Sequence, residues 1–114
     1  MKRDETVYLR HILDAINRIE EYLTGVDEAN FQEQYLIQDG VIRQLEIIGE
    51  AVKHLSNKLR NRYPYIPWQD IAGARDKLIH QYFGVDIEEV WLMVSEDIPT
   101  LKAEIEKILE NSHT

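Results

Sequence analysis

Residues 68–86 read WQDIAGARDKLIHQYFGVD, and their apolar side chains recur at the spacing of one helix. At about 100° of rotation per residue, six of them fall within roughly 60° of one line: Trp68, Ile71, Ala72, Leu78, Ile79 and Tyr82. Arg75 lies at the centre of this stripe. Because a guanidinium is always charged and is costly to bury unpaired, Arg75 requires a buried acid, a second subunit or a bound anion. Otherwise its side chain must extend to the edge of the helix surface.

Two long helical patterns precede this stretch. Residues 4–23 carry apolar side chains at three- and four-residue steps, and Gly25 is placed to end that helix. Residues 28–59 carry a second such pattern, which Asp27 can cap. Gly40 interrupts it at a cost of about 1 kcal/mol relative to Ala, and it indicates a bend in one long helix.

Residues 57–68, NKLRNRYPYIPW, form the clearest connector. Pro64 and Pro67 disfavour helix in the residues before them, and Pro67 suits the first position of the next helix. Three aromatic residues alternate here with Arg60 and Arg62: Tyr63, Tyr65 and Trp68. Such a combination can stack on and pair with single-stranded nucleic acid, or the aromatic side chains can fix the connector to the core.

One more helical pattern follows the opening stretch. Gly84 is suited to end the preceding helix and Asp86 to cap the next one. From residue 87 to residue 108 the apolar spacing continues straight through Pro99, which predicts one kinked helix or two nearly collinear helices. The sequence therefore predicts an all-α fold, an antiparallel bundle of four to five helices with a kinked C-terminal helix.

Length, charge and composition limit the classes of protein. A chain of 114 residues is expected to form one domain, residues 1–114. It has no cysteine, no apolar signal core and no stretch long enough to span a membrane, so we expect a cytoplasmic protein without disulfides. The net charge of −8 argues against binding nucleic acid over the whole surface. Residues 51–80 nevertheless contain two acidic side chains against six basic ones: Lys53, Lys58, Arg60, Arg62, Arg75 and Lys77.

The spacing of Arg75, His80 and Tyr82 near the end of a helix, after YPYIPW and before FGVD, resembles the signature of the HEPN superfamily. Within it, the chain is similar to HepT-like ribonuclease toxins over nearly its whole length. The resemblance implies an endoribonuclease that works as a homodimer, without metal or other cofactor, on RNA and not DNA. It also implies that His80 acts on the ribose 2′-OH or the leaving 5′-oxygen, and that Arg75 stabilises charge on the scissile phosphate.

The geometry of a regular helix bears on this implied site. Arg75 and His80 are separated by about 140° of rotation and about 7.5 Å of rise, whereas Arg75 and Tyr82 share a face. The two proposed catalytic side chains do not converge in one straight helix. Either the last turn opens near His80, or the site combines residues of two chains, which we favour.

The resemblance also implies a partner. In the family, a cognate minimal nucleotidyltransferase antitoxin adds AMP to the tyrosine at the position of Tyr82, as in a type VII-like toxin–antitoxin system. An anionic group there would occupy the phosphate site beside Arg75. Five further residues are candidates for RNA binding or for support of the site: Lys53, Arg60, Arg62, Asp76 and Lys77.

A different class of function fits the same residues. A catalytically idle helical module could use them to bind a nucleotide or a partner protein. The intact pair of Arg75 and His80 favours the enzyme, whereas the acidic net charge favours the binding module.

Overall fold

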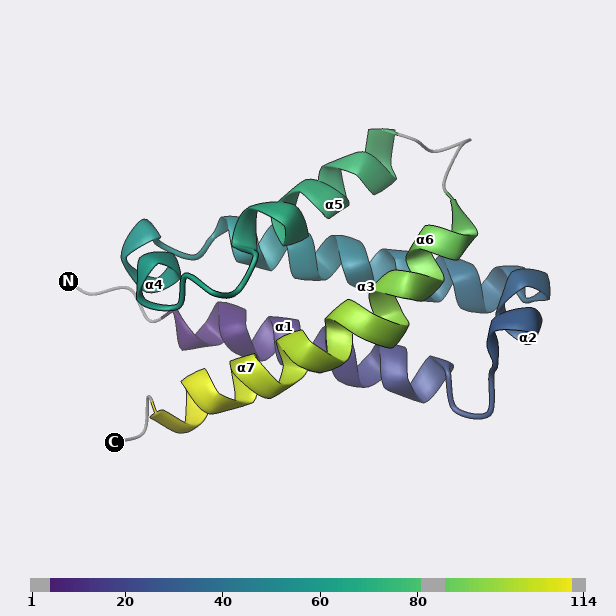
Figure 1. The fold of residues 1–114 in the computed structure, drawn as a ribbon, viewed down its shortest axis with the longest axis horizontal. Helices are drawn as coiled ribbons and strands as arrows, with labels where there is room; N and C mark the ends of the chain where they lie inside the picture. Colours follow the sequence, from purple (N-terminus) through teal and green to yellow (C-terminus); the bar gives the residue numbers. More distant parts are fainter. Residues whose placement is uncertain (1–4, 81–85, 112–114) are drawn as a thin grey trace.

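The computed structural model describes residues 5–80 and 86–111, without the side chains of residues 75–80. Every regular element in this part of the chain is a helix, so the predicted all-α fold is confirmed (Figure 1). The elements are α1 (Thr6–Tyr22), α2 (Glu28–Glu33), α3 (Tyr35–Lys53), α4 (Asn57–Arg62), α5 (Trp68–His80), α6 (Ile87–Leu92), the π-helical segment η1 (Met93–Asp97) and α7 (Ile98–Asn111). Among them, none combines the length and the apolar character that a membrane crossing requires.

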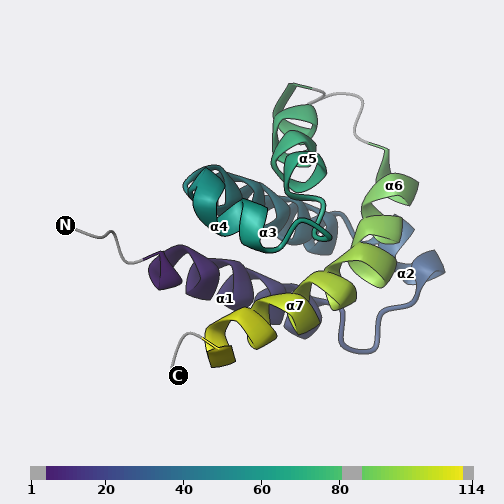
Figure 2. The same ribbon diagram turned by 60° about the vertical axis from the view of Figure 1, so that its left-hand side comes forward.

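The core lies between four helices, α1, α3, α5 and α7, that pack in an antiparallel arrangement (Figure 1). α3 packs against α1 on one side and α5 on the other, while α7 covers α1 (Figure 2). The helix periodicity places one apolar face of each helix inward, and these faces supply fully buried side chains: Leu9, Ile12, Ile16, Ile19, Val41, Ile48, Val52 and Ile105. Each such side chain contributes about 1.5–3 kcal/mol through burial.

The predicted helix over residues 28–59 is in fact three helices, α2, α3 and α4. The break after α2 is stabilised by the buried amide of Gln38, whose Nε2 donates to the carbonyl oxygens of Phe31 and Gln32 at 2.8 and 3.1 Å. The break after α3 is followed by Ser56, whose hydroxyl oxygen accepts from the Leu59 N–H at 3.1 Å and caps α4. Both breaks leave the apolar residues in phase, which is why the pattern predicted one helix.

Gly25 and Gly40 have different roles. Gly25 has a φ of 74° and ends the turn after α1, as predicted. α3 continues through Gly40 without a break. A Cβ atom at this position would lie 3.2 Å from the ring of Tyr22. Gly40 therefore allows α3 to approach the C-terminal end of α1.

The C-terminal helix is continuous but distorted next to its proline, as the sequence predicted. Asp86 caps α6, with its Oδ1 accepting from the backbone N–H groups of Glu88 and Glu89 at 3.0 and 3.4 Å. The helix then widens into η1, which ends at Asp97, two residues before Pro99. Because proline has no N–H and its ring clashes with the carbonyl one turn earlier, a π-helical turn is a reasonable way to accommodate it.

Candidate functional site

Trp68 fixes the start of α5, the helix that carries the sequence motif. Its side chain is 5% exposed, and its indole Nε1–H is shared between the carbonyl oxygens of Arg60 and Tyr63 at 3.2 and 3.0 Å. Of the two roles expected for the aromatic side chains of the connector, Trp68 therefore has the second: it fixes the connector to the core. α5 begins at Trp68, and Pro67 precedes it with a carbonyl that accepts from the Ile71 N–H at 3.1 Å.

The motif residues up to His80 lie on α5. α5 packs against α3, and its residues Ile71 and Ala72 are half-buried against the core. Arg75 and His80 share this helix, and in a regular helix their Cα atoms are separated by about 7.5 Å of rise. The side chains of Arg75, Asp76, Lys77 and His80, and the whole of Tyr82, lie outside the described residues. Their contacts therefore stay predictions.

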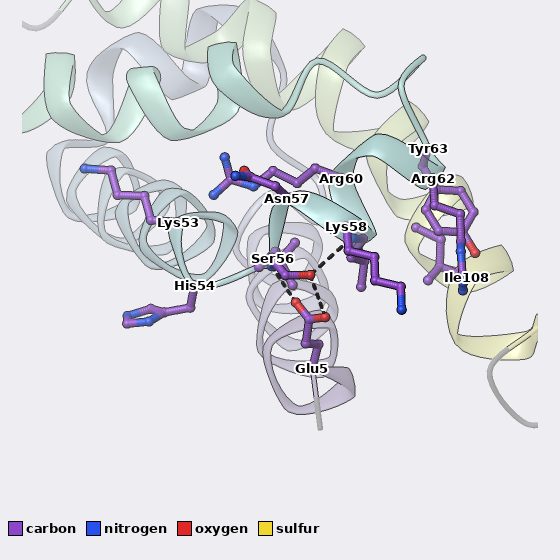
Figure 3. A pocket seen from close by; sticks show the side chains of 12 residues that line it. Glu5, Lys53, His54, Ser56, Asn57, Lys58, Arg60, Arg62, Tyr63 and Ile108 are labelled. Atoms are coloured by element: carbon purple, nitrogen blue, oxygen red, sulfur yellow. Dashed lines mark hydrogen bonds between the residues drawn. The ribbon is translucent and has the colours of Figure 1, made fainter. Parts of the chain in front are cut away.

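A cavity of about 760 Å³ lies at the end of the bundle, where α3 ends and α4 follows. We call it the basic pocket. One carboxylate, that of Glu5, lines it together with four cationic side chains: Lys53, Lys58, Arg60 and Arg62 (Figure 3). On a chain with a net charge of −8, this is a local excess of positive charge.

Arg60 has a structural role within the basic pocket. Its Nη2 donates to the carbonyl oxygen of Val52 at 2.8 Å, near the C-terminal end of α3. Its Nε is buried and has no hydrogen-bond partner among the described residues. The half-buried side chain of Arg60 therefore joins α4 to the last turn of α3, where carbonyl groups favour a cation.

Lys58 and Arg62 differ from Arg60 in their surroundings. They are four residues apart on α4, are both exposed, and extend together from the helix, whereas Arg60 extends toward α3 (Figure 3). Neither side chain has a hydrogen bond or an ion pair with another residue in the described ranges. Both cationic groups are thus exposed and unpaired within the part of the chain that the structure describes.

Glu5, the acidic residue of the pocket, accepts hydrogen bonds from within the protein. The Glu5 carboxylate accepts hydrogen bonds from the backbone N–H of Ser56 and from its hydroxyl, the latter at 2.8 Å (Figure 3). These bonds tie the start of α1 to the N-cap of α4. The Glu5 charge is thus partly satisfied by fixed donors, and it offsets only one of the four cations.

Two aromatic side chains stand at the pocket beside these cations. Both belong to its lining; Tyr63 is half-buried and His54 is exposed. The His54 ring stacks on Tyr8, with centroids 5.0 Å apart and planes 10° from parallel. His54 Nε2 also lies 3.5 Å from Oε1 of Glu50.

A second cavity, of about 400 Å³, lies between α3, α5 and α7 and has the opposite character. Its floor is apolar, and its charged lining consists of three carboxylates, those of Asp70, Asp97 and Glu104. Tyr65 also lines it; desolvation raises the pKa of the Tyr65 hydroxyl, and the hydrogen bond with Glu104 raises it further. This groove is unsuited to a polyanion.

The structure thus brings three of the predicted supporting residues, Lys53, Arg60 and Arg62, to one pocket. The pocket lies at the Trp68 end of α5. Along a regular helix, Arg75 is about 10 Å and His80 about 18 Å beyond Trp68. Sequence reasoning did not single out Lys58 as a site residue, although its spacing of four from Arg62 on a helix was a usable signal.

Comparison with known proteins gives consistent matches. The sequence model of the family described as Ribonuclease HepT-like matches residues 12–108. A protein of Thermococcus cleftensis named "Probable ribonuclease HepT" is 47% identical over 108 residues, which cover 95% of this chain and 98% of that protein.

A second relative has a different length. A protein of Methanocaldococcus jannaschii named "Gamma-glutamylcyclotransferase and putative RNase MJ0434" is 49% identical over 110 residues, which cover 96% of this chain and 50% of that protein. This chain therefore corresponds to about half of that relative. No solved structure matches the chain. From the match over residues 12–108 and from these identities, the chain belongs to the HepT-like ribonuclease family.

Proposed function

We propose that this chain is an endoribonuclease toxin that cleaves RNA in a cleft between two copies of itself, without a metal ion, in the cytoplasm. The observation that carries the proposal is the presence of Arg75 and His80 on α5 in a chain of the HepT-like ribonuclease family. Relatives named as ribonucleases support RNA as the substrate.

The proposed chemistry follows from the two residue types. The ribose 2′-oxygen attacks the adjacent phosphorus, and the bond from phosphorus to the 5′-oxygen of the next nucleotide breaks. One proton leaves the 2′-OH and one is gained by the leaving 5′-oxygen. His80 carries out one of these transfers, because an imidazole titrates near neutral pH, and solvent water carries out the other. Arg75 stabilises the charge that develops on the phosphate oxygens. The products carry a 2′,3′-cyclic phosphate and a 5′-hydroxyl.

The two-chain cleft is supported by helix geometry. Arg75 and His80 face directions about 140° apart on a regular α5. An Arg75 from one subunit and a His80 from the other can approach one phosphate where two α5 helices meet. The homodimer is therefore part of the catalytic proposal.

The remaining predicted residues have supporting roles in this proposal. Asp76 lies one helical turn before His80 and orients its imidazole, while Lys77 adds positive charge beside the motif. Lys53, Arg60 and Arg62 contribute to the basic pocket, Arg60 chiefly by holding α4 on α3.

The proposed regulator is a cognate minimal nucleotidyltransferase. The Tyr82 oxygen attacks the α-phosphorus of ATP, pyrophosphate leaves, and the resulting AMP occupies the phosphate site beside Arg75. With the Tyr82→Phe variant as acceptor, the antitoxin should transfer little or no AMP. Undiminished transfer to that variant would exclude Tyr82 as the main acceptor.

The experiment that tests the activity compares single-turnover cleavage of total tRNA and of an mRNA in EDTA. His80→Ala should lower the rate by about 10²–10⁴-fold and Arg75→Ala by about 10²–10³-fold. His11→Ala, which removes an exposed histidine of α1, is the matched control and should keep the wild-type rate.

Two results would count against the activity. Equal cleavage by wild type and His80→Ala would indicate a contaminating nuclease or a different site. A folded wild-type protein, shown by its intact mass to lack AMP, that cuts neither RNA would favour the catalytically idle binding module instead.

A further inference from the structure

The exposed face of α4 carries two positive charges that no ion pair or side-chain hydrogen bond engages within residues 5–80 and 86–111. Lys58 and Arg62 are one helical turn apart, and like charges at this spacing destabilise a helix. No acidic side chain in the described part of the chain pairs with either of them. Arg60, by contrast, is committed to Val52.

From this arrangement we infer that the basic pocket binds the phosphate backbone of single-stranded RNA through Lys58 and Arg62, at a position outside the cleavage motif. The inference rests on the proposed ribonuclease function and adds to it a second contact with the substrate. The cavity of about 760 Å³ is large enough for a nucleotide unit to lie against the α4 face.

The aromatic side chains of the pocket favour RNA over an acidic protein as the ligand. Tyr63 and His54 both belong to the pocket lining, and the His54 ring stacks on Tyr8. A positively charged groove that also presents aromatic rings is the usual arrangement for single-stranded nucleic acid, because bases stack on the rings while cations hold the backbone.

The position of the pocket separates it from the chemistry. It lies at the Trp68 end of α5, and the motif begins about 10 Å further along the helix. At about 3.4 Å per stacked nucleotide, this length of α5 alone corresponds to roughly three nucleotides of a strand that runs from the pocket toward the motif. Contacts in the pocket therefore hold a flanking segment of the substrate and do not touch the bond that is cut.

The test measures binding and does not require cleavage. Two proteins are compared: His80→Ala, and His80→Ala that also carries Lys58→Ala and Arg62→Ala. Each is titrated into a 5′-fluorescein-labelled oligouridylate of 20 nucleotides at several salt concentrations, and binding is followed by fluorescence anisotropy. Loss of two phosphate contacts should reduce the slope of log affinity against log salt by about 1.4. The matched control removes two exposed arginines of α1, Arg10→Ala and Arg18→Ala, and should leave the slope unchanged.

Three outcomes would overturn the inference. The first is an unchanged slope in the Lys58→Ala and Arg62→Ala protein, and the second is an equal loss in the α1 control. The third is that a labelled polyglutamate of the same length binds as tightly as the RNA. This result would indicate an acidic protein partner.

Cleavage then separates this inference from the proposed function. In an otherwise wild-type protein, Lys58→Ala and Arg62→Ala should raise KM and leave kcat unchanged, because the lost contacts stabilise bound substrate and transition state equally. If the wild-type protein binds RNA with the expected salt slope but does not cleave it, the proposed ribonuclease activity is wrong. The inference that the basic pocket binds RNA would still stand.

Discussion

Two arginines of α4, two residues apart, have different roles because their surroundings differ. Arg60 turns toward α3 and donates to a backbone carbonyl, whereas Arg62 extends from the exposed face next to Lys58. The spacing of charges in the sequence placed both in a basic connector. It could not distinguish them, because the partner of Arg60 is a backbone atom of the preceding helix.

This difference predicts that substitution by alanine lowers stability much more at Arg60 than at Arg62. Arg60→Ala should lower the free energy of unfolding by about 1–2 kcal/mol, because it removes a charged hydrogen bond and the packing of the side-chain stem. Arg62→Ala should change it by less than about 0.5 kcal/mol. Urea titration followed by circular dichroism gives both values, and equal losses would show that Arg60 does not hold α4 on α3.

The helices differ in how well the sequence predicted them. Helical periodicity was sufficient for α1, α5 and the C-terminal helix, and the caps at Asp27 and Asp86 are confirmed. The pattern over residues 28–59 failed because apolar residues stay in phase across both breaks. Those breaks depend on bonds that the pattern does not encode, such as the Gln38 amide on the carbonyls of α2.

The candidate site was predictable to a smaller extent than the helices. The motif was recognised from the spacing of Arg75 and His80, and three cations of the basic pocket were named as candidates. The pocket itself could not be predicted, because its lining also includes Glu5 and Ile108, far apart in the chain. Only the packing of α1, α4 and α7 brings those residues together.

The position of α5 depends on Trp68, which predicts a test of that helix. Trp68→Phe keeps an apolar ring but removes the indole N–H, so two carbonyl oxygens lose their shared donor. The free energy of unfolding should fall by about 1–3 kcal/mol, and RNA cleavage should fall even where the protein remains folded. Tyr65→Phe, at an exposed neighbour, is the control and should change stability by less than about 0.5 kcal/mol.

Near-wild-type stability in Trp68→Phe would mean that burial of the ring alone fixes the start of α5. The hydrogen bonds to Arg60 and Tyr63 would then be incidental to the position of the motif helix.

For the assembled molecule, the two-chain cleft predicts complementation. Equal amounts of Arg75→Ala and His80→Ala subunits are unfolded together and refolded, so that half of the dimers contain one of each. Such a mixed dimer has one site with both residues intact, and the mixture should recover roughly a quarter of the wild-type rate. A mixture as inactive as either variant alone would place both residues of a working site in one chain.

The most direct test of RNA cleavage by Arg75 and His80 is the chemistry of the new RNA ends formed in EDTA. Mass spectrometry of the fragments from wild-type protein should find 2′,3′-cyclic phosphate and 5′-hydroxyl ends, with no such fragments from His80→Ala. Fragments with 3′-hydroxyl and 5′-phosphate ends would mean that water, and not the ribose 2′-oxygen, attacks the phosphorus, and would contradict the proposed mechanism.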